Sequence, residues 1–505
     1  MISRMERAGG FSRRRVLRGA GALALASAAL EMTGCLARVP ERTAATATGA
    51  GPDIQFDIAA LLAAPPQTSA TGVAFQMPPV HTVFVTGRLE RDPVRADQVM
   101  LASALTRLEA AYPFDAANLL TFVSYGIPYF RRLPGGLAGR LVSSRMPRLL
   151  SDRGRYVLEE ASPGPTDVSP GHPGVTKLRY QVPVVIEAND LLLTLRSDHA
   201  SFLSDALAWL GGSNSLRGRT VASPALRGLL TFTSSRPMFT QIGLPRAVAH
   251  QNGLPYARYI QPESPMWMGF TDQQVGASGP AAICTFAGNA SARFSDAVTG
   301  DYFDNGSVQH LSHDILDMLQ YHDMASPASV PGADGTFVQR VQYVFHAPQI
   351  AAGDADQFTD GGGPAFLPNA NRGPGYARRT AQGLGTNVDF RTGQREHRMG
   401  HLSCLQRSSR AADGTPVHIR MDGPGFDTMD VPDGSRQPKL QFTIFVPSAD
   451  FFSRLRVSQA SLDLAAEFGV SQKDNGLERF MTATRRQNFL CPPRRHRAFP
   501  LCEFT

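Results

Sequence analysis

The sequence predicts an α+β fold in which two ferredoxin-like halves each pack helices against an antiparallel sheet. Three segments lead to this prediction: a strand–helix–strand unit over 81–125, a strand that runs into a helix over 190–210, and the same order over 439–468. Because strand-then-helix recurs in two distant parts of the chain, we expect a duplicated unit. The chain of 505 residues also exceeds the ~250–300 residues at which a single core usually divides.

The first segment has the pattern of a targeting sequence. Residues 12–18 read Ser-Arg-Arg-Arg-Val-Leu-Arg, and an apolar run follows over 19–30. This pattern is typical of a twin-arginine signal peptide, and the run is shorter than the ~20 apolar residues of a membrane-spanning helix. We therefore expect residues 1–34 to be removed and the protein to be exported folded by the twin-arginine translocase. Its destination would be extracytoplasmic, in the periplasm or on the outer face of the cell membrane.

A second targeting feature follows directly. Met32-Thr-Gly-Cys35 resembles a lipoprotein-processing site, although Met stands where Leu is usual, so Cys35 is a candidate for a lipid anchor. Residues 35–74 are rich in Ala, Thr, Pro and Gly and predict a flexible tether.

The N-terminal ferredoxin-like half is expected over 75–262. Residues 81–87 are rich in residues that favour strands and predict one strand, and 119–125 predict a second. Between them, apolar residues at helical spacing predict a helix, namely Val99, Leu101, Leu105 and Leu108. A strand over 190–196 then leads into a helix over 199–210, whose shared face carries Phe202, Ala206, Trp209 and Leu210.

The C-terminal half is expected over 263–505. Residues 439–446 predict a strand and 449–468 a helix, with Phe452, Leu455, Leu462 and Ala466 at helical spacing. Residues 351–387 are dense in Gly, Pro, Asp and Asn and predict a long inserted loop.

Charge and cysteine content exclude several classes of protein. The net charge is +7, but residues 1–34 hold six Arg and two Glu, which leaves +3 for the rest and no reason to expect nucleic-acid binding. No cysteine lies in a CxxC pair, which argues against zinc-ribbon and iron–sulfur sites. Cys491 and Cys502 are either a disulfide that closes the C-terminal segment or two free thiols, and the sequence leaves both open.

Hydrolase and simple metal motifs are weak. GxSxG is absent. His397 and His401 lie four residues apart, yet the Glu of a zinc-protease helix is missing. The spacing of Cys404, His418 and Met421 is too irregular to indicate a copper site.

Three short segments are better organised. Gly269-Phe-Thr-Asp-Gln273 lies near the junction of the halves, Gly400-His401-Leu402 follows, and Arg420 comes nineteen positions after His401. In this order they resemble the dye-decolourising (DyP-type) peroxidases, which carry a GxxDG motif, then a proximal His, then a distal Arg. With the strand–helix pairs around Asp190 and Lys439, the resemblance spans roughly residues 78–480.

The resemblance implies a duplicated ferredoxin-like fold of the dimeric α/β-barrel type with bound haem b. Residues Gly269 and Phe270 would line the cofactor, and His401 would ligate its iron, with Asp463 hydrogen-bonded to the other imidazole nitrogen. Asp272 would move a proton between the oxygens of hydrogen peroxide, and Arg420 would stabilise developing negative charge. The implied function is an exported peroxidase that oxidises a small organic donor, with a homo-oligomer as a family-level expectation.

Two departures leave alternatives open. Gln273 replaces the closing Gly of the motif, and the usual Arg-rich stretch before the distal Arg reads Pro-Val-His-Ile over 416–419. One alternative is a catalytically impaired haem-binding or structural lipoprotein of the same fold. The other is a non-haem metal oxidase that uses His397 and His401.

The individual residues also have alternative roles. His397 and His418 compete with His401 as the axial ligand. Asp272 could instead cap a turn, and Arg420 could pair with Asp422 in a strand.

Overall fold

The structure is a computed structural model. It describes residues 28–42, 52–58, 61–62, 67–68, 74–75, 78–168, 177, 179–224, 226, 228–260, 262, 264–268, 281–288, 294–322, 417–460, 462, 466 and 477–505. The predicted loop over 351–387 and the last part of the helix predicted over 449–468 lie outside or largely outside these residues.

The first half has the strand order of a ferredoxin-like unit. Its main elements are β3 (His81–Leu89), α2 (Arg95–Ala111), β4 (Leu120–Gly126), β6 (Leu191–Ser197), α5 (Ala200–Leu210) and β9 (Leu230–Phe239). The strands lie side by side in the order β4-β6-β3-β9, and all of these pairs are antiparallel. The first strand thus pairs with the third and the fourth, and the second lies at an edge, as a βαββαβ unit requires.

The second half repeats this arrangement. Its main elements are β10 (Ser307–Leu316), β11 (Ile419–Arg420), β12 (Gly423–Asp427), β13 (Gln437–Val446), α13 (Ala449–Ala460) and β14 (Met481–Cys491). The order is β14-β10-β13-β11, with β12 also paired to β13, and again every pair is antiparallel. The predicted α+β class and the duplication are therefore confirmed.

Shorter elements connect these units. They are β1 (Gln67–Thr68), β2 (Ala74–Phe75), α3 (Ile127–Arg132), α4 (Arg140–Ser143), β5 (Val185–Ile186), β7 (Ser215–Leu216), β8 (Arg219–Thr220), α6 (Leu244–Gln251) and α7 (Met318–Tyr321). One-turn 3-10 helices lie at Gly136–Ala138, Ala257–Tyr259, Ala281–Cys284, Glu478–Phe480, Arg494–His496 and Cys502–Phe504. In the described ranges, no helix has both the length and the apolar composition needed to cross a bilayer.

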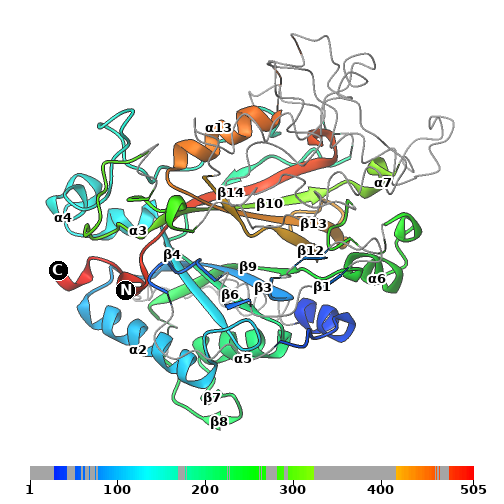
Figure 1. Ribbon diagram of the computed structural model, residues 1–505, viewed down its shortest axis with the longest axis horizontal. Coiled ribbons are helices and arrows are strands. Elements are labelled where there is room, and N and C mark those ends of the chain that lie inside the picture. Colours follow the sequence, from blue (N-terminus) through cyan, green and yellow to red (C-terminus); the bar gives the residue numbers. More distant parts are fainter. Residues whose placement is uncertain are drawn as a thin grey trace, which may run out of the picture.

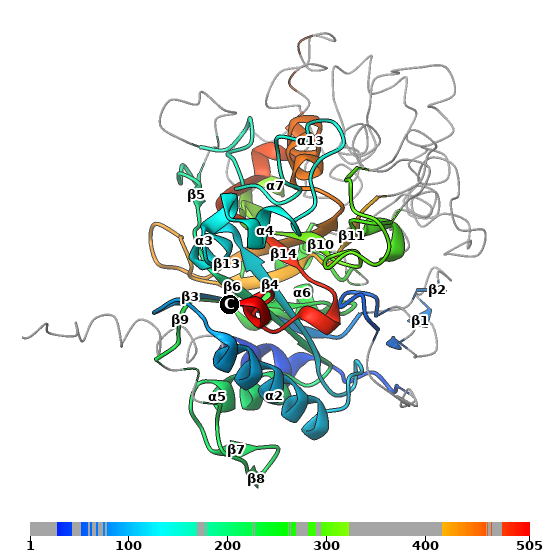
Figure 2. The ribbon, with the colours of Figure 1, turned by 90° about the vertical axis from the view of Figure 1, so that its left-hand side faces the viewer.

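The two half-sheets join at one edge and approach each other at the other. At the joint, Phe489 and Leu490 of β14 pair with Gly126 and Tyr125 of β4, and β5 runs parallel to β14. At the opposite edges β12 lies close against β9, because a Cβ added to Gly425 would lie 3.1 Å from the carbonyl oxygen of Pro237. The sheet thus has an inner face between the halves and an outer face covered by helices, with α2 and α5 on one side and α13 on the other (Figures 1 and 2).

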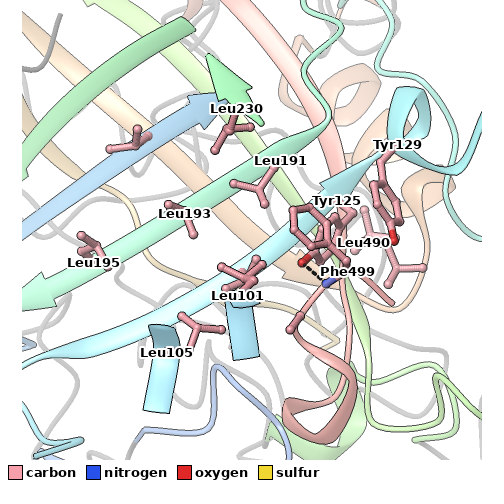
Figure 3. Packing of buried hydrophobic residues seen from close by; sticks show 14 of the residues in the cluster. Leu101, Leu105, Tyr125, Tyr129, Leu191, Leu193, Leu195, Leu230, Leu490 and Phe499 are labelled. Atoms are coloured by element: carbon pink, nitrogen blue, oxygen red, sulfur yellow. Dashed lines mark hydrogen bonds between the residues drawn. The ribbon is translucent and has the colours of Figure 1, made fainter. Parts of the chain in front are cut away.

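The main core lies between α2, α5 and the sheet of the first half. Leu101 and Leu105 of α2 face Leu193 and Leu195 of β6, and all four side chains are buried (Figure 3). Val99, predicted to share this helix face, is instead 54% exposed. The prediction was wrong because position 99 lies two residues from 101, about 200° around the helix.

The same core extends to the C-terminal segment. Tyr125 and Tyr129 pack on Phe499, and the hydroxyl of Tyr125 accepts a hydrogen bond from the amide of Phe499 at 2.7 Å (Figure 3). Cys502 lies beside the hydroxyl of Tyr129, whereas Cys491 neighbours Gln55. The two thiols are free, so the disulfide alternative is not formed.

The segment around the predicted processing site contacts the body of the protein. Residues 28–36 are helical, Leu30 is buried in the main core, and Cys35 is exposed. The buried Arg42 forms an ion pair with Asp198. This segment therefore lies against α5, at the surface that covers the first half-sheet.

Candidate functional site

Most of the sequence-predicted site lies outside the described residues. This applies to His401, Asp272, Gly269, Phe270 and Asp463. The competing ligand His397 and the altered motif position Gln273 also lie outside them, and so does Cys404. Their predicted roles stay predictions, and Arg420 is the predicted site residue that the structure places.

Arg420 lies on β11 and belongs to a row of residues across the second half-sheet. Its Cα pairs with Ile444, which pairs with His310, which pairs with Asn488. Directly paired residues of antiparallel strands point to the same side of the sheet. Because Ile444 belongs to the core that Phe452 of α13 also joins, this row lies on the side covered by α13, hereafter the α13 face.

Arg420 is partly buried there. Burial lowers the pKa of its guanidinium, and the carboxylate of Asp422 opposes this shift. The neighbouring His418 is buried, and Met421 packs with Phe445 on the inner face. Within the described ranges, no group of three His, Cys, Asp or Glu side chains could hold a metal ion.

His310 is the most unusual group on the α13 face. Its side chain is fully buried, and its Nδ1 lies 2.7 Å from Oδ1 of Asn488. Its ring stacks on Phe452, and Nε2 is buried without a hydrogen-bond partner. Burial, and next the charge of Arg486, lower the pKa of His310 well below its usual value, so this imidazole is neutral.

A buried ion network adjoins His310 on the same face. Nη2 of Arg486 lies 2.7 Å from Asp167, and Nη2 of Arg456 lies 3.1 Å from Glu478. Nε and Nη1 of Arg486 and Nε of Arg456 are buried without partners. Although burial by itself would raise the pKa of Glu478, the charges of Arg456 and Lys177 lower it to about 2.

Two further groups of this network titrate unusually. Burial raises the pKa of Asp314 to about 6 despite the nearby Arg486 and Arg456. Burial lowers the pKa of Lys177 to about 8. Below about pH 6, where Asp314 is protonated, three cations surround two carboxylates and the network carries an excess of positive charge. Above that pH, ionised Asp314 balances the third cation.

A second polar cluster lies on the inner face, between the halves. Nδ1 of His313 lies 2.7 Å from the Thr484 hydroxyl, and its Nε2 lies 3.5 Å from Asp427, which is also 3.5 Å from Lys439. Arg485 is paired with Asp430 through two hydrogen bonds, of 2.6 and 2.7 Å. Carboxylates therefore pair directly with the cations of this cluster, as Asp167 and Glu478 do on the α13 face.

Sequence reasoning missed the buried groups of the α13 face, namely His310, Asp314, Arg456, Glu478 and Arg486. A usable signal exists in β10, whose ten buried residues read Ser-Val-Gln-His-Leu-Ser-His-Asp-Ile-Leu. A strand with this many polar residues needs partners on both sides of the sheet, which points to a polar site rather than a plain core.

Comparison with known protein families gives one match. Residues 161–330 match a family of unknown function, DUF7405. This segment includes Asp167, Lys177, His310 and Asp314 of the α13 face. No curated protein matches the chain.

Solved structures of DyP-type peroxidases are similar to most of the chain at low identity. The DyP-type peroxidase of Cellulomonas bogoriensis is 14% identical with a TM-score of 0.45, over 82% of this chain and 90% of that one. The encapsulated enzyme of Mycobacterium smegmatis is 13% identical with a TM-score of 0.43, over 86% and 99%. A variant of DypB from Rhodococcus jostii RHA1, solved in complex with haem, is 11% identical with a TM-score of 0.46, over 84% and 96%. These neighbours are proteins of the family that the sequence resembles.

Proposed function

We propose that the protein is an exported, haem-dependent peroxidase that reduces hydrogen peroxide and oxidises an organic donor. The observation that carries the proposal is the position of Arg420, which lies in one row with His310 on the buried α13 face. A cation held in such a low-dielectric surface is suited to stabilise negative charge that develops on a reacting oxygen.

The described residues of the α13 face fit a haem in two respects. Ile444, Phe442 and Phe452 provide an apolar, aromatic surface of the kind on which flat cofactors pack. The buried nitrogens of His310 and Arg486 lack partners within the protein, so the face has polar capacity that a bound ligand can use.

Each residue of the proposed site has a distinct role. Haem, when bound, supplies the iron that accepts the oxidising equivalents of peroxide. His401 would hold that iron, and Asp463 would accept a hydrogen bond from its other nitrogen and make the ligand more basic. Asp272 would carry a proton from one peroxide oxygen to the other, and Arg420 would stabilise the negative charge on the leaving oxygen.

The test is the absorption spectrum of the mature protein expressed with a supply of haem, before and after addition of peroxide. A Soret band that shifts with peroxide and is lost in His401→Ala, but kept in His397→Ala, supports the proposal and its ligand. His397 and His401 lie four residues apart in the sequence, so the second variant controls for a general effect of losing a histidine in this segment.

The other outcomes identify the alternatives. A Soret band without peroxide-dependent oxidation of any donor points to an impaired haem-binding protein, for which Gln273→Gly is the variant expected to restore turnover. Metal without porphyrin points to a non-haem oxidase, and a folded protein without either overturns the proposal.

Export is the second part of the proposal. Residues 12–18 support the twin-arginine route, and the exposed side chain of Cys35 is accessible for lipidation. Replacing Arg13 and Arg14 together by Lys should retain the protein in the cytoplasm, as measured by fractionation. Cys35→Ser should release it from the membrane fraction without preventing export, and an unchanged distribution would exclude the anchor.

A further inference from the structure

The protonation of His310 follows from its neighbours. Nδ2 of Asn488 donates a hydrogen bond to the carbonyl oxygen of Glu159 at 2.9 Å, and this orients the amide so that Oδ1 faces His310. Since that oxygen can only accept, Nδ1 of the neutral imidazole must carry the hydrogen. Nε2 therefore presents a bare lone pair.

That lone pair is buried but not blocked by the stacked ring. The rings of His310 and Phe452 are inclined by 19°, so Phe452 covers the flat face of the imidazole. The lone pair of Nε2 lies in the ring plane and points along the edge. A buried acceptor without a donor costs about 1–3 kcal/mol, and use by a bound ligand is one explanation for such an atom.

Unused donors lie beside this unused acceptor. Asn488 pairs across the sheet with His310, and Arg486, two residues earlier on β14, points to the same side. The guanidinium carbon of Arg486 lies 5.6 Å from the centre of the Phe452 ring that stacks on His310. Nη2 of Arg486 is held by Asp167, while Nε and Nη1, also buried, have no acceptor.

We propose that His310 and Arg486 form the peroxide-binding part of the site, in which Nε2 of His310 accepts the O–H of hydrogen peroxide and Arg486 donates to its oxygen. Hydrogen peroxide suits this pair because each of its oxygens both donates and accepts, whereas a plain anion leaves Nε2 without a donor. No bond to hydrogen is broken in this binding step. The proposal rests on the proposed function and adds two binding residues to it.

The test compares two variants with two controls on the same strands of the haem-loaded protein. His310→Gln removes the bare ring nitrogen. Arg486→Lys keeps a charge beside Asp167 but loses Nε and Nη1, the two nitrogens without an acceptor. His313→Gln and Arg485→Lys make the same changes on the inner face. Nε2 of His313 also lacks a hydrogen bond, but it lies 3.5 Å from the carboxylate of Asp427. Soret absorbance per protein reports whether each variant is folded and loaded.

Two measurements decide the proposal. His310→Gln and Arg486→Lys should each raise the KM for peroxide about 10-fold to 100-fold, with kcat at saturating peroxide and the KM for the donor little changed. Arg486→Lys should also weaken the binding of cyanide, titrated by the Soret shift, because the bound anion accepts from Arg486, whereas His310→Gln should leave cyanide binding near wild type. The controls should leave both quantities near wild type.

Four outcomes overturn it. Equal effects of the inner-face controls would show a general structural role, and unchanged peroxide and cyanide constants would exclude the pair while leaving the peroxidase intact. A low-spin spectrum that becomes high-spin in His310→Gln would make His310 an iron ligand instead. Absence of a Soret band from folded wild-type protein would overturn the proposed function and this inference together.

Discussion

At the scale of single residues, Asp314 links protonation to stability. Burial raises the pKa of its carboxyl to about 6, from 3.8, so the folded state binds this proton more tightly than the unfolded state. Its contribution to stability is therefore present at low pH and is lost as pH rises from about 4 to about 6. Asp314→Asn should remove this loss and raise the free energy of unfolding at pH 7 by on the order of 3 kcal/mol.

Urea unfolding at pH 4 and pH 7 checks this prediction. The advantage of Asp314→Asn should be present at pH 7 and small at pH 4. The control is Asp152→Asn at an exposed position, which should leave both values nearly unchanged. A destabilised Asp314→Asn at pH 7 would mean that the charged carboxylate is needed by Arg456 and Arg486.

Glu478 provides the opposite case, because its partners hold its pKa low. Glu478→Gln leaves Arg456 and Lys177 buried with less compensating charge, and it should cost about 3–5 kcal/mol at neutral pH. The exposed pair Arg131–Glu160 offers a matched control, since Glu160→Gln should cost at most about 1 kcal/mol. Similar losses in both variants would contradict the buried network as described.

The candidate site was only partly predictable at this scale. Arg420 was predicted from the sequence because it follows two other short motifs in the order found in DyP-type peroxidases, and the structure places it on the α13 face. His310 and Arg486 were not predicted. Their importance lies in buried nitrogens without partners, which depends on the orientation of Asn488 and on the position of Phe452. Such relations arise between distant segments and leave no spacing pattern in the sequence.

At the scale of elements, the joint between β4 and β14 depends on Gly126. A Cβ at this position would lie 2.3 Å from the carbonyl oxygen of Asn189 and 2.5 Å from Nε2 of Gln487. Gly126→Ala must therefore displace backbone at the joint, and it should lower the free energy of unfolding by about 1–3 kcal/mol.

Thermal or urea unfolding measures this effect. Gly154→Ala is the control, because the added methyl group would meet only the exposed side chain of Asp152, which can move away. If Gly126→Ala were as stable as wild type, the joint would be looser than the structure describes.

The predictability of the elements follows from their surroundings. β3, β6 and β13 were predicted because they carry apolar runs, and α2 and α5 because one face of each is apolar. β10 and β14 were not predicted, since their buried residues include His, Asp, Arg and Gln that face either the α13 network or the inner cluster. Where both sides of a strand are polar, the alternation that identifies a strand is hidden.

At the scale of the whole molecule, the inner face couples the two halves. Phe84, Leu192 and Met238 of the first half pack there with Leu311 and Phe489 of the second. Leu311→Ala should cost about 2–5 kcal/mol and shift a single unfolding transition rather than create two.

Calorimetry and a fluorescence probe should report coincident transitions for this variant. Val99→Ala, at an exposed position, should change stability by no more than about 0.5 kcal/mol. Two separate transitions in the wild type would show that each half unfolds on its own.

The pairing of β4 with β14 also has a consequence for how the chain is made. During synthesis, β4 emerges long before β14, so one edge of the first sheet has no neighbour until the ribosome has passed residue 490. An open sheet edge is a template for association with other chains. The nascent protein therefore has a long interval in which a chaperone that covers this edge would prevent aggregation, and that interval ends only when the second half has been translated.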